Sequence, residues 1–250
     1  MKGKRKVSRR MFKAVACGWF LLATVVAQAA DFSVGRVDIR FAEEGWKELP
    51  LPDQTVAYGG DRSGALAVEA KLFVRDAPGP EGSILVLVSA NSRGLGGGRG
   101  GYMTYTPDCK SDAHNYREGN EGFRASFAQC LTVTPLYSGA SVFKALAPQV
   151  LEAQPADNPQ ALPPVYTVWS RHAISTGSFV DVRVFLGAPI RGDGASASGE
   201  LPSGVLPEHV VWGRQLRDAV KSSVYSLSGR LDMPAIRLTP PATGGTAGGG

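Results

Sequence analysis

Alternating apolar and polar positions predict strands in several parts of the chain. In residues 66–74 every second side chain is apolar and the charged ones point the other way, which is the pattern of a strand with one face on a core. Residues 84–88 form a continuous apolar run typical of a central strand, and residues 77–82 between them are rich in Pro and Gly. The two runs therefore predict an antiparallel hairpin, and residues 36–41 predict a further alternating strand.

A second hairpin is predicted later in the chain. Residues 165–174 and 179–186 are rich in β-branched and aromatic side chains, and the short segment 175–178 between them contains Gly177. In the second of these strands the valines share one face, whereas Asp181 and Arg183 lie on the other.

Apolar residues at three- and four-residue steps predict one long helix over residues 207–227. Pro207 suits the first helical position, and Gly229 suits the stop. The side chains expected to be buried are Trp212, Leu216, Ala219, Val220, Val224 and Leu227. Residues 141–153 show a weaker helical spacing, with Ser141 as a possible cap and Pro148 interrupting it.

Other segments carry weaker patterns. Residues 42–53 read as a connection in which Trp46 fills the core, residues 55–58 and 131–136 as short strands, and residues 231–238 as an edge strand. The segment between Cys109 and Cys130 is polar and is interpreted as an excursion, with a helical turn over residues 123–128.

The order of these elements predicts an α+β fold. We expect an antiparallel sheet built from hairpins, with the long C-terminal helix packed on one face. No repeat period is present, so residues 30–238 are expected to form a single domain, followed by a disordered Pro/Gly tail over residues 239–250.

The first 29 residues have the organisation of a cleavable export signal. Seven basic residues and no acid precede Ala14, and an apolar run follows over residues 14–27. That run spans about 21 Å as a helix, short of a hydrocarbon core of about 30 Å. Ala27 and Ala29 supply a small-x-small site, which predicts cleavage before Ala30; the alternative is an uncleaved membrane anchor.

The segment Ser8–Lys13 resembles the twin-arginine signal of the bacterial Tat pathway. The resemblance rests on Ser8, Arg9, Arg10 and Phe12, whereas Lys13 stands where that signal usually has Leu. It implies an export route through Arg9 and Arg10 and says nothing of the fold. The general Sec route remains the alternative, because arginine pairs are common in signal segments.

The net positive charge of the chain comes from the predicted signal. The chain has 27 Lys and Arg against 22 Asp and Glu. Because seven of the basic residues precede Ala14 and no acid precedes Asp31, the exported part holds 20 basic and 22 acidic side chains. Its net charge of about −2 gives no support for nucleic-acid binding, which depends on neutralising phosphates.

The exported part contains two cysteines, Cys109 and Cys130. A pair of cysteines in an exported chain predicts one disulfide. The alternative is a Cys/His metal site that includes His114, although the cysteines lack the close spacing of such sites.

Two glycine-containing motifs invite a chemical interpretation. Gly96-x-Gly98-x-x-Gly101 formally matches a dinucleotide fingerprint, but β-forming residues follow it instead of a helix. Ala90-x-Ser92-x-Gly94 resembles a nucleophile elbow, again without the helix that such an elbow requires.

The three histidines do not form a ligand motif. His114, His172 and His209 are dispersed, with His172 expected as a structural strand residue and His209 as a surface residue of the long helix. The tripeptide Arg191-Gly192-Asp193 is interpreted as a chance match in a loop. The sequence therefore assigns no catalytic residue, metal ligand or cofactor.

These observations predict an exported protein, periplasmic or secreted, that acts as a non-catalytic binding or interaction domain. Its expected partners are the export machinery and an unknown envelope component or protein, and no membrane span is expected in the mature chain. The alternative function is an exported hydrolase with its site near Ser92 and the Gly94–Gly101 loop.

Overall fold

The chain has an α+β fold, as the order of its predicted elements indicates. A computed structural model describes residues 31–51, 68–75, 84–91, 109–120, 126–146, 164–191, 197 and 199–239. Within these residues there are two sheets and two helices. The predicted export signal, the predicted strand at 55–58, the turn predicted at 77–82, the Gly94–Gly101 segment and the residues after Thr239 lie outside the described residues.

The main sheet of the described chain is antiparallel and has seven strands in the order β3-β4-β5-β9-β8-β7-β6. Both predicted hairpins are confirmed, since β4 pairs with β5 and β8 with β9. The strands are β3 Trp46–Leu49, β4 Val68–Arg75, β5 Ile84–Asn91, β6 Tyr116–Gly119, β7 Phe127–Tyr137, β8 Val165–Ile174 and β9 Phe179–Leu186.

Three predictions on this sheet are wrong. Residues 127 and 128, expected in a helical turn, begin β7, which is also much longer than the strand predicted at 131–136. The connection at 42–53 contains β3, and the polar excursion after Cys109 contains β6. In each case a neighbouring strand supplies hydrogen bonds that the local sequence does not reveal.

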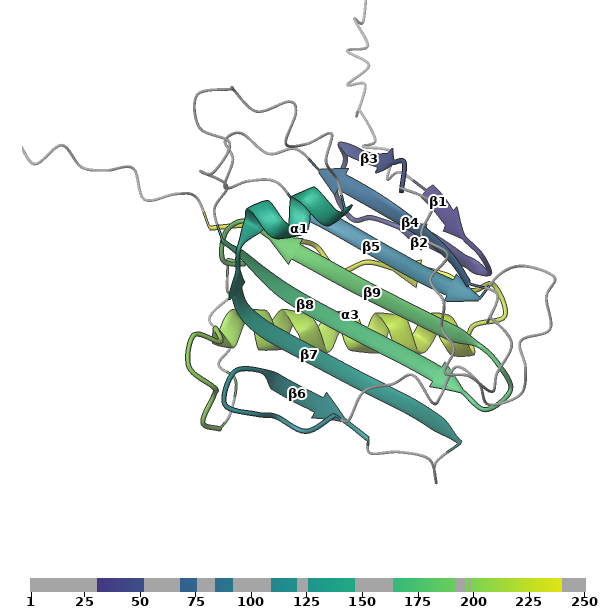
Figure 1. The fold of residues 1–250 in the computed structure, drawn as a ribbon. Coiled ribbons are helices and arrows are strands. Elements are labelled where there is room, and N and C mark those ends of the chain that lie inside the picture. Colours follow the sequence, from purple (N-terminus) through teal and green to yellow (C-terminus); the bar gives the residue numbers. More distant parts are fainter. Residues whose placement is uncertain are drawn as a thin grey trace, which may run out of the picture.

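Helix α3, Pro207–Tyr225, packs across β7, β8 and β9 on one face of the main sheet (Figure 1). Leu216 and Val220 are completely buried there, as their spacing predicts. Gly213 allows the close approach, because a Cβ at this position would lie 2.9 Å from Leu131 Cδ1. The prediction for Leu227 is wrong: the helix ends before it, and its side chain is fully exposed.

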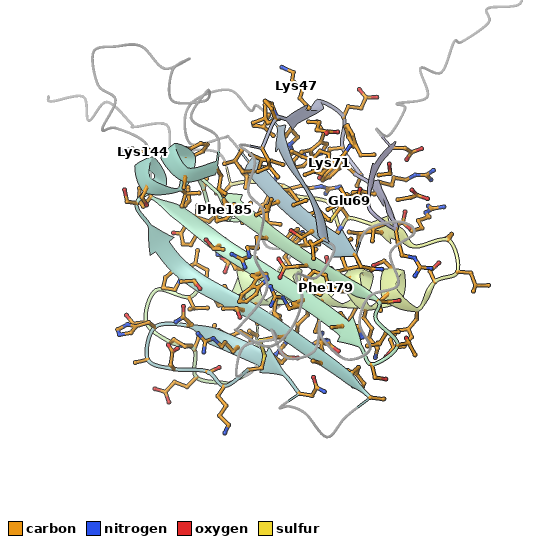
Figure 2. The ribbon with its side chains drawn as sticks, turned by 45° about the vertical axis from the view of Figure 1, so that its right-hand side comes forward. Lys47, Glu69, Lys71, Lys144, Phe179 and Phe185 are labelled. Carbon is orange, nitrogen blue, oxygen red and sulfur yellow. A yellow bond between two sulfur atoms is a disulfide. The ribbon has the colours of Figure 1, made fainter. Side chains whose placement is uncertain are left out.

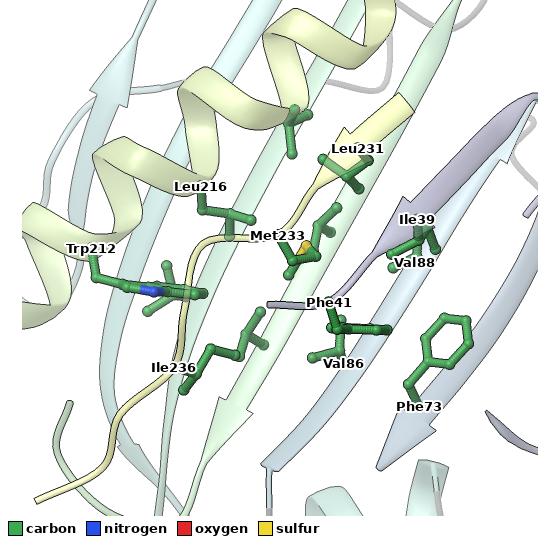
Figure 3. Packing of buried hydrophobic residues seen from close by; sticks show 14 of the residues in the cluster. Ile39, Phe41, Phe73, Val86, Val88, Trp212, Leu216, Leu231, Met233 and Ile236 are labelled. Carbon is green, nitrogen blue, oxygen red and sulfur yellow. The ribbon is translucent and has the colours of Figure 1, made fainter. Parts of the chain in front are cut away.

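A small sheet lies beside α3 on the same face of the main sheet (Figures 1 and 3). It has the order β1-β2-β10, with β1 Asp31–Val34, β2 Val37–Arg40 and β10 Arg230–Asp232. Phe41, just after β2, stacks on Trp46 with ring centroids 4.0 Å apart and meets Phe73 of β4 edge-on. One hydrophobic cluster thus joins both sheets and α3.

The end of the chain departs from the predicted edge strand at 231–238. Only Arg230–Asp232 forms a strand, and it pairs parallel to β2. Gly229 does not cap α3 but turns the chain into β10: its φ is +67°, and a Cβ there would lie 2.1 Å from the carbonyl oxygen of Arg36. The following segment is held by Arg75, which donates to the carbonyl of Ile236 at 2.6 Å.

Helix α1, Gly139–Leu146, lies on the opposite face of the main sheet from α3 (Figure 1). Phe143 packs there with Leu85 and Phe185. Figure 2 labels Phe185 on this face of the sheet, near Lys144 of α1. Elsewhere on this face, polar side chains such as Asp181 and Arg183 alternate with a small apolar cluster of Ala173 and Phe179. Neither helix in the described part of the chain is long and apolar enough to cross a membrane.

Candidate functional site

A pocket of about 400 Å³ lies on the face of the main sheet that α3 does not cover. Ser141 and Val142 of the first helical turn of α1 border it, and Trp169 and Phe185 supply its aromatic lining. The other described side chains that line it are polar or cationic: Asn115, Arg117, Thr132, Thr134, Thr167 and Arg183. We call this the arginine–threonine pocket.

Strand register assembles the floor of the arginine–threonine pocket. Arg117 of β6 stands opposite Thr132 of β7, which stands opposite Trp169 of β8, and Trp169 stands opposite Arg183 of β9. Side chains directly opposite one another in adjacent strands share a face, so these four residues form one row across the sheet. The alternate residues of the same strands, including Leu131, Val168 and Val182, point to the α3 core instead.

A buried carboxylate anchors the row that includes Arg183. Asp181 is almost completely buried, and its Oδ2 accepts hydrogen bonds from Arg171 Nε at 2.6 Å and from Trp169 Nε1 at 2.7 Å. Its Oδ1 lies 3.4 Å from Arg183 Nε. Burial of Asp181 is tolerated because these two hydrogen bonds and the contact with Arg183 replace its hydration.

Trp169 holds the two guanidinium groups in place. The guanidinium carbon of Arg171 lies 5.0 Å from the centroid of the indole and that of Arg183 lies 4.6 Å from it. Both distances are within the range of cation–π attraction. The indole therefore serves here as a support for cations, and its N–H is already used by Asp181.

Strand β6, which forms one wall of the pocket, is fastened to α3 by ion pairs. Glu118 accepts a hydrogen bond from Arg214 Nε at 2.8 Å and also pairs with Arg217 and Tyr116. Burial alone would raise the pKa of Glu118, but the hydrogen bonds from Tyr116, Arg214 and Arg217 outweigh it and lower the pKa.

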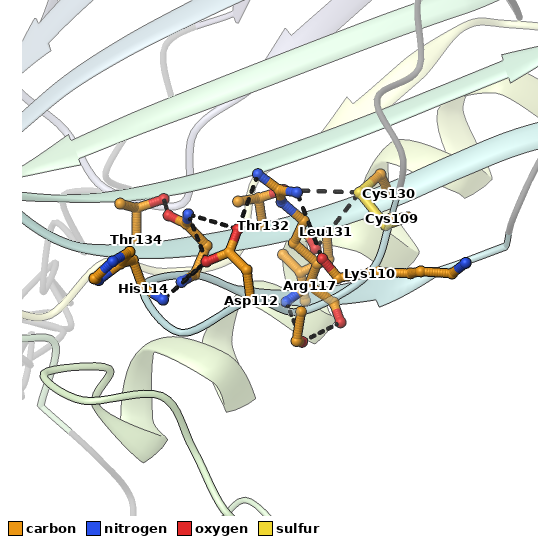
Figure 4. A network of polar contacts seen from close by, with 11 residues as sticks. Cys109, Lys110, Asp112, His114, Arg117, Cys130, Leu131, Thr132 and Thr134 are labelled. Atoms are coloured by element: carbon orange, nitrogen blue, oxygen red, sulfur yellow. Dashed lines mark hydrogen bonds and ion pairs between the residues drawn. A yellow bond between two sulfur atoms is a disulfide. The ribbon is translucent and has the colours of Figure 1, made fainter.

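The predicted disulfide between Cys109 and Cys130 is confirmed, with the two Cα atoms 5.5 Å apart. It joins the start of the segment before β6 to β7 (Figure 4). Ser111 then hydrogen-bonds to both the N–H and the carbonyl of Arg117, so this segment runs along the outer edge of β6. Because both sulfur atoms are bonded, the alternative metal site with His114 has no thiolate ligands.

A turn around Asp112 positions the amide of Asn115 at the pocket (Figure 4). The hydrogen bond from the Asn115 side chain, followed by that from the backbone N–H of His114, lowers the pKa of Asp112. Asn115 Oδ1 in turn accepts a hydrogen bond from the Thr134 hydroxyl at 2.8 Å. Asp112 also lies 3.6 Å from Arg117, which partly balances the charge of this arginine.

The histidines singled out in the sequence are not brought together. His114 lies on an exposed turn, whereas His172 and His209 are fully buried on the α3 side of the sheet. The expectation of a surface position for His209 is wrong, because its ring packs against Tyr166 and its Nε2 accepts a hydrogen bond from the Ile190 N–H. No group of three His, Cys, Asp or Glu side chains within the described part of the chain is arranged to hold a metal ion.

The alternative hydrolase site stays a prediction, because Ser92 and the Gly94–Gly101 loop lie outside the described residues, as does the glycine motif that was not interpreted as a nucleotide site. The strand that leads to them ends at Asn91, whose Oδ1 accepts a hydrogen bond from the Phe179 N–H. Of the Arg191-Gly192-Asp193 tripeptide, only Arg191 is described, and its N–H donates to the carbonyl of Arg237.

Sequence reasoning missed the arginine–threonine pocket. The available signal was the pair Asp181 and Arg183 on the polar face of an otherwise apolar strand, opposite Trp169 and Arg171 of its hairpin partner. The pocket residues on β6 and β7 could not be predicted from the sequence, because the pairing of β7 with β8 joins segments that are far apart in the chain. Comparisons of the chain with protein-family models, curated proteins and solved structures found no match.

Proposed function

We propose that the chain is an exported, non-catalytic binding domain whose ligand occupies the arginine–threonine pocket. The observation that carries this proposal is the composition of the pocket: it offers guanidinium, hydroxyl and amide groups, which bind and orient a ligand. A hydroxyl nucleophile needs an adjacent base. Among the described residues that line the pocket there is no carboxylate, imidazole or thiol to act as one.

Two features of the sequence support export. The first 29 residues have the charge, length and Ala27-x-Ala29 site of a cleavable signal, and disulfides such as Cys109–Cys130 persist in oxidising compartments. N-terminal sequencing of the envelope fraction should find a chain beginning at Ala30. Replacing Arg9 and Arg10 by Lys should block export by the Tat route, whereas unchanged export would favour Sec.

Binding at the pocket is tested by NMR on the mature chain. A mixed library of neutral sugars, amino acids, organic acids and phosphorylated compounds is titrated into isotope-labelled protein. We expect the backbone signals of Thr132, Thr167 and Arg183 to shift with at least one class of compound. Shifts confined to other parts of the protein would contradict the proposed site.

The hydrolase alternative is separated by an activity assay. The mature protein is incubated with generic ester and glycoside substrates, in parallel with a Ser92→Ala variant. The proposal predicts no turnover above the uncatalysed rate by either protein. Turnover by the wild type that the Ser92→Ala variant loses would establish the hydrolase instead.

A further inference from the structure

Next to the Arg183 side chain that lines the arginine–threonine pocket, one buried carboxylate, Asp181, is shared by two guanidinium groups. Asp181 faces both Arg171 and Arg183, and the hydrogen bonds of its Oδ2 go to Arg171 and Trp169. Arg183 Nε is 3.4 Å from Oδ1 in a geometry that makes no hydrogen bond. The Arg183 side chain is 40% exposed, so its donors can serve a ligand in the pocket.

The Trp169 ring at the floor of the pocket is not open for stacking with a neutral sugar. Neutral sugars commonly stack on an open aromatic face, but the guanidinium groups of Arg171 and Arg183 both lie over the Trp169 ring. The groups left for recognition are the cation of Arg183 and the hydroxyls beside it. These are donors that suit an oxyanion, which accepts charge-assisted hydrogen bonds from arginine.

Two further groups point the same way. The hydroxyl oxygen of Thr167 is buried at the pocket and has no hydrogen-bond partner within the described part of the chain. Buried hydroxyls are usually paired, so an unpaired one beside a cavity is a candidate contact for a ligand. The first turn of α1, which contains no acidic residue, also borders the pocket with the positive end of its helix dipole.

A second pocket provides a comparison, because its arginines are paired with carboxylates. It lies on the small sheet, has a volume of about 410 Å³ and includes Arg40 and Arg230. Arg40 pairs with Asp31 at 3.0 Å, and Arg230 pairs with Asp232 at 2.8 Å. Each arginine there donates a hydrogen bond to a carboxylate, whereas the Arg183 Nε has only an ion-pair contact with Asp181 at 3.4 Å.

From these observations, and resting on the proposed function, we infer that the arginine–threonine pocket binds a small oxyanionic ligand, carboxylate or phosphate, held by Arg183 and the Thr167 hydroxyl.

The inference is tested by calorimetric titration of the mature protein with gluconate, glucose 1-phosphate and glucose at low ionic strength. At least one of the two anions should bind ten times more tightly than glucose, and the arm that binds identifies the carboxylate or the phosphate. Raising the salt concentration should weaken this binding, because the charges are partly exposed.

Variants locate the anion. Arg183→Gln should weaken binding at least tenfold, whereas Arg230→Gln, which removes an equal charge from the second pocket, should change it less than twofold. Thr167→Val should weaken binding severalfold without lowering the midpoint of thermal unfolding. Thr167→Val still tests the inference if Arg183→Gln fails to fold.

The outcomes separate the inference from the proposed function. If the mixed library shifts pocket signals but neither anion binds more tightly than glucose, the oxyanion inference is overturned and the binding function stands. Equal losses in Arg183→Gln and Arg230→Gln would also overturn it. If no compound shifts the pocket signals, both proposals fall.

Discussion

The unpaired Thr167 hydroxyl should lower the free energy of unfolding while it contributes to the proposed binding of the anion. An unpaired buried hydroxyl costs stability, whereas Thr134 next to it donates to Asn115 at 2.8 Å. Thr167→Val should therefore leave the free energy of unfolding unchanged or raise it by about 1 kcal/mol. The matched change Thr134→Val should lower it by about 1 kcal/mol. Urea denaturation measures both, and a clear loss in Thr167→Val would mean that its hydroxyl has a partner in the folded protein.

Two buried histidines make the folded state sensitive to acid. Burial lowers the pKa of His172 to about 4, with a smaller contribution from Lys221, and burial lowers the pKa of His209 to about 4. Between pH 6.5 and 4 the unfolded chain binds protons at these rings and the folded chain does not. The free energy of unfolding should therefore have its full value above pH 6.5 and should fall by about 3 kcal/mol per histidine as the pH drops to 4.

Denaturation at several pH values between 7 and 4 tests this acid sensitivity. His172 lies between Phe127 and Tyr225 with both ring nitrogens lacking hydrogen bonds in the described structure, so His172→Phe should fit and should reduce the pH slope by about half. His114→Gln, on an exposed turn, is the control and should leave the slope unchanged. An equal slope in wild type and His172→Phe would exclude His172 as a cause.

Among the elements, α3 gives the sharpest test of how the core is built. Leu216 is completely buried against the main sheet, and Leu227 beyond the helix is fully exposed. Leu216→Ala should cost about 2–5 kcal/mol in unfolding free energy, whereas Leu227→Ala should cost less than about 0.5 kcal/mol. Similar losses in the two variants would mean that α3 does not pack as described.

The elements also show how far the sequence alone can be taken. The β8–β9 hairpin and α3 were predicted at nearly the right residues because alternation, helical spacing and Pro207 are local signals. Strands β3 and β6 are short and have no clear alternation, and they form because they pair with β4 and β7. The pocket depends on the register of four strands, so Asp181 and Arg183 indicated only part of it.

For the molecule as a whole, the disulfide ties the polar segment at the sheet edge to the fold. Thiol labelling of the protein purified without its first 29 residues, under denaturing, non-reducing conditions, should find no free cysteine. Replacing both Cys109 and Cys130 by Ser should lower stability by about 3 kcal/mol, because the bond closes a loop of about 21 residues. Two labelled thiols would show that the bond does not form.

The central claim is that the sheet face opposite α3 carries a ligand site. Its most direct test is a crystal structure of the mature protein grown with whichever of gluconate or glucose 1-phosphate binds. We predict electron density for the anion in the arginine–threonine pocket, with an oxygen within hydrogen-bond distance of both Arg183 and the Thr167 hydroxyl. Density for the anion elsewhere on the protein, or a pocket filled by the chain's own side chains, would contradict the account.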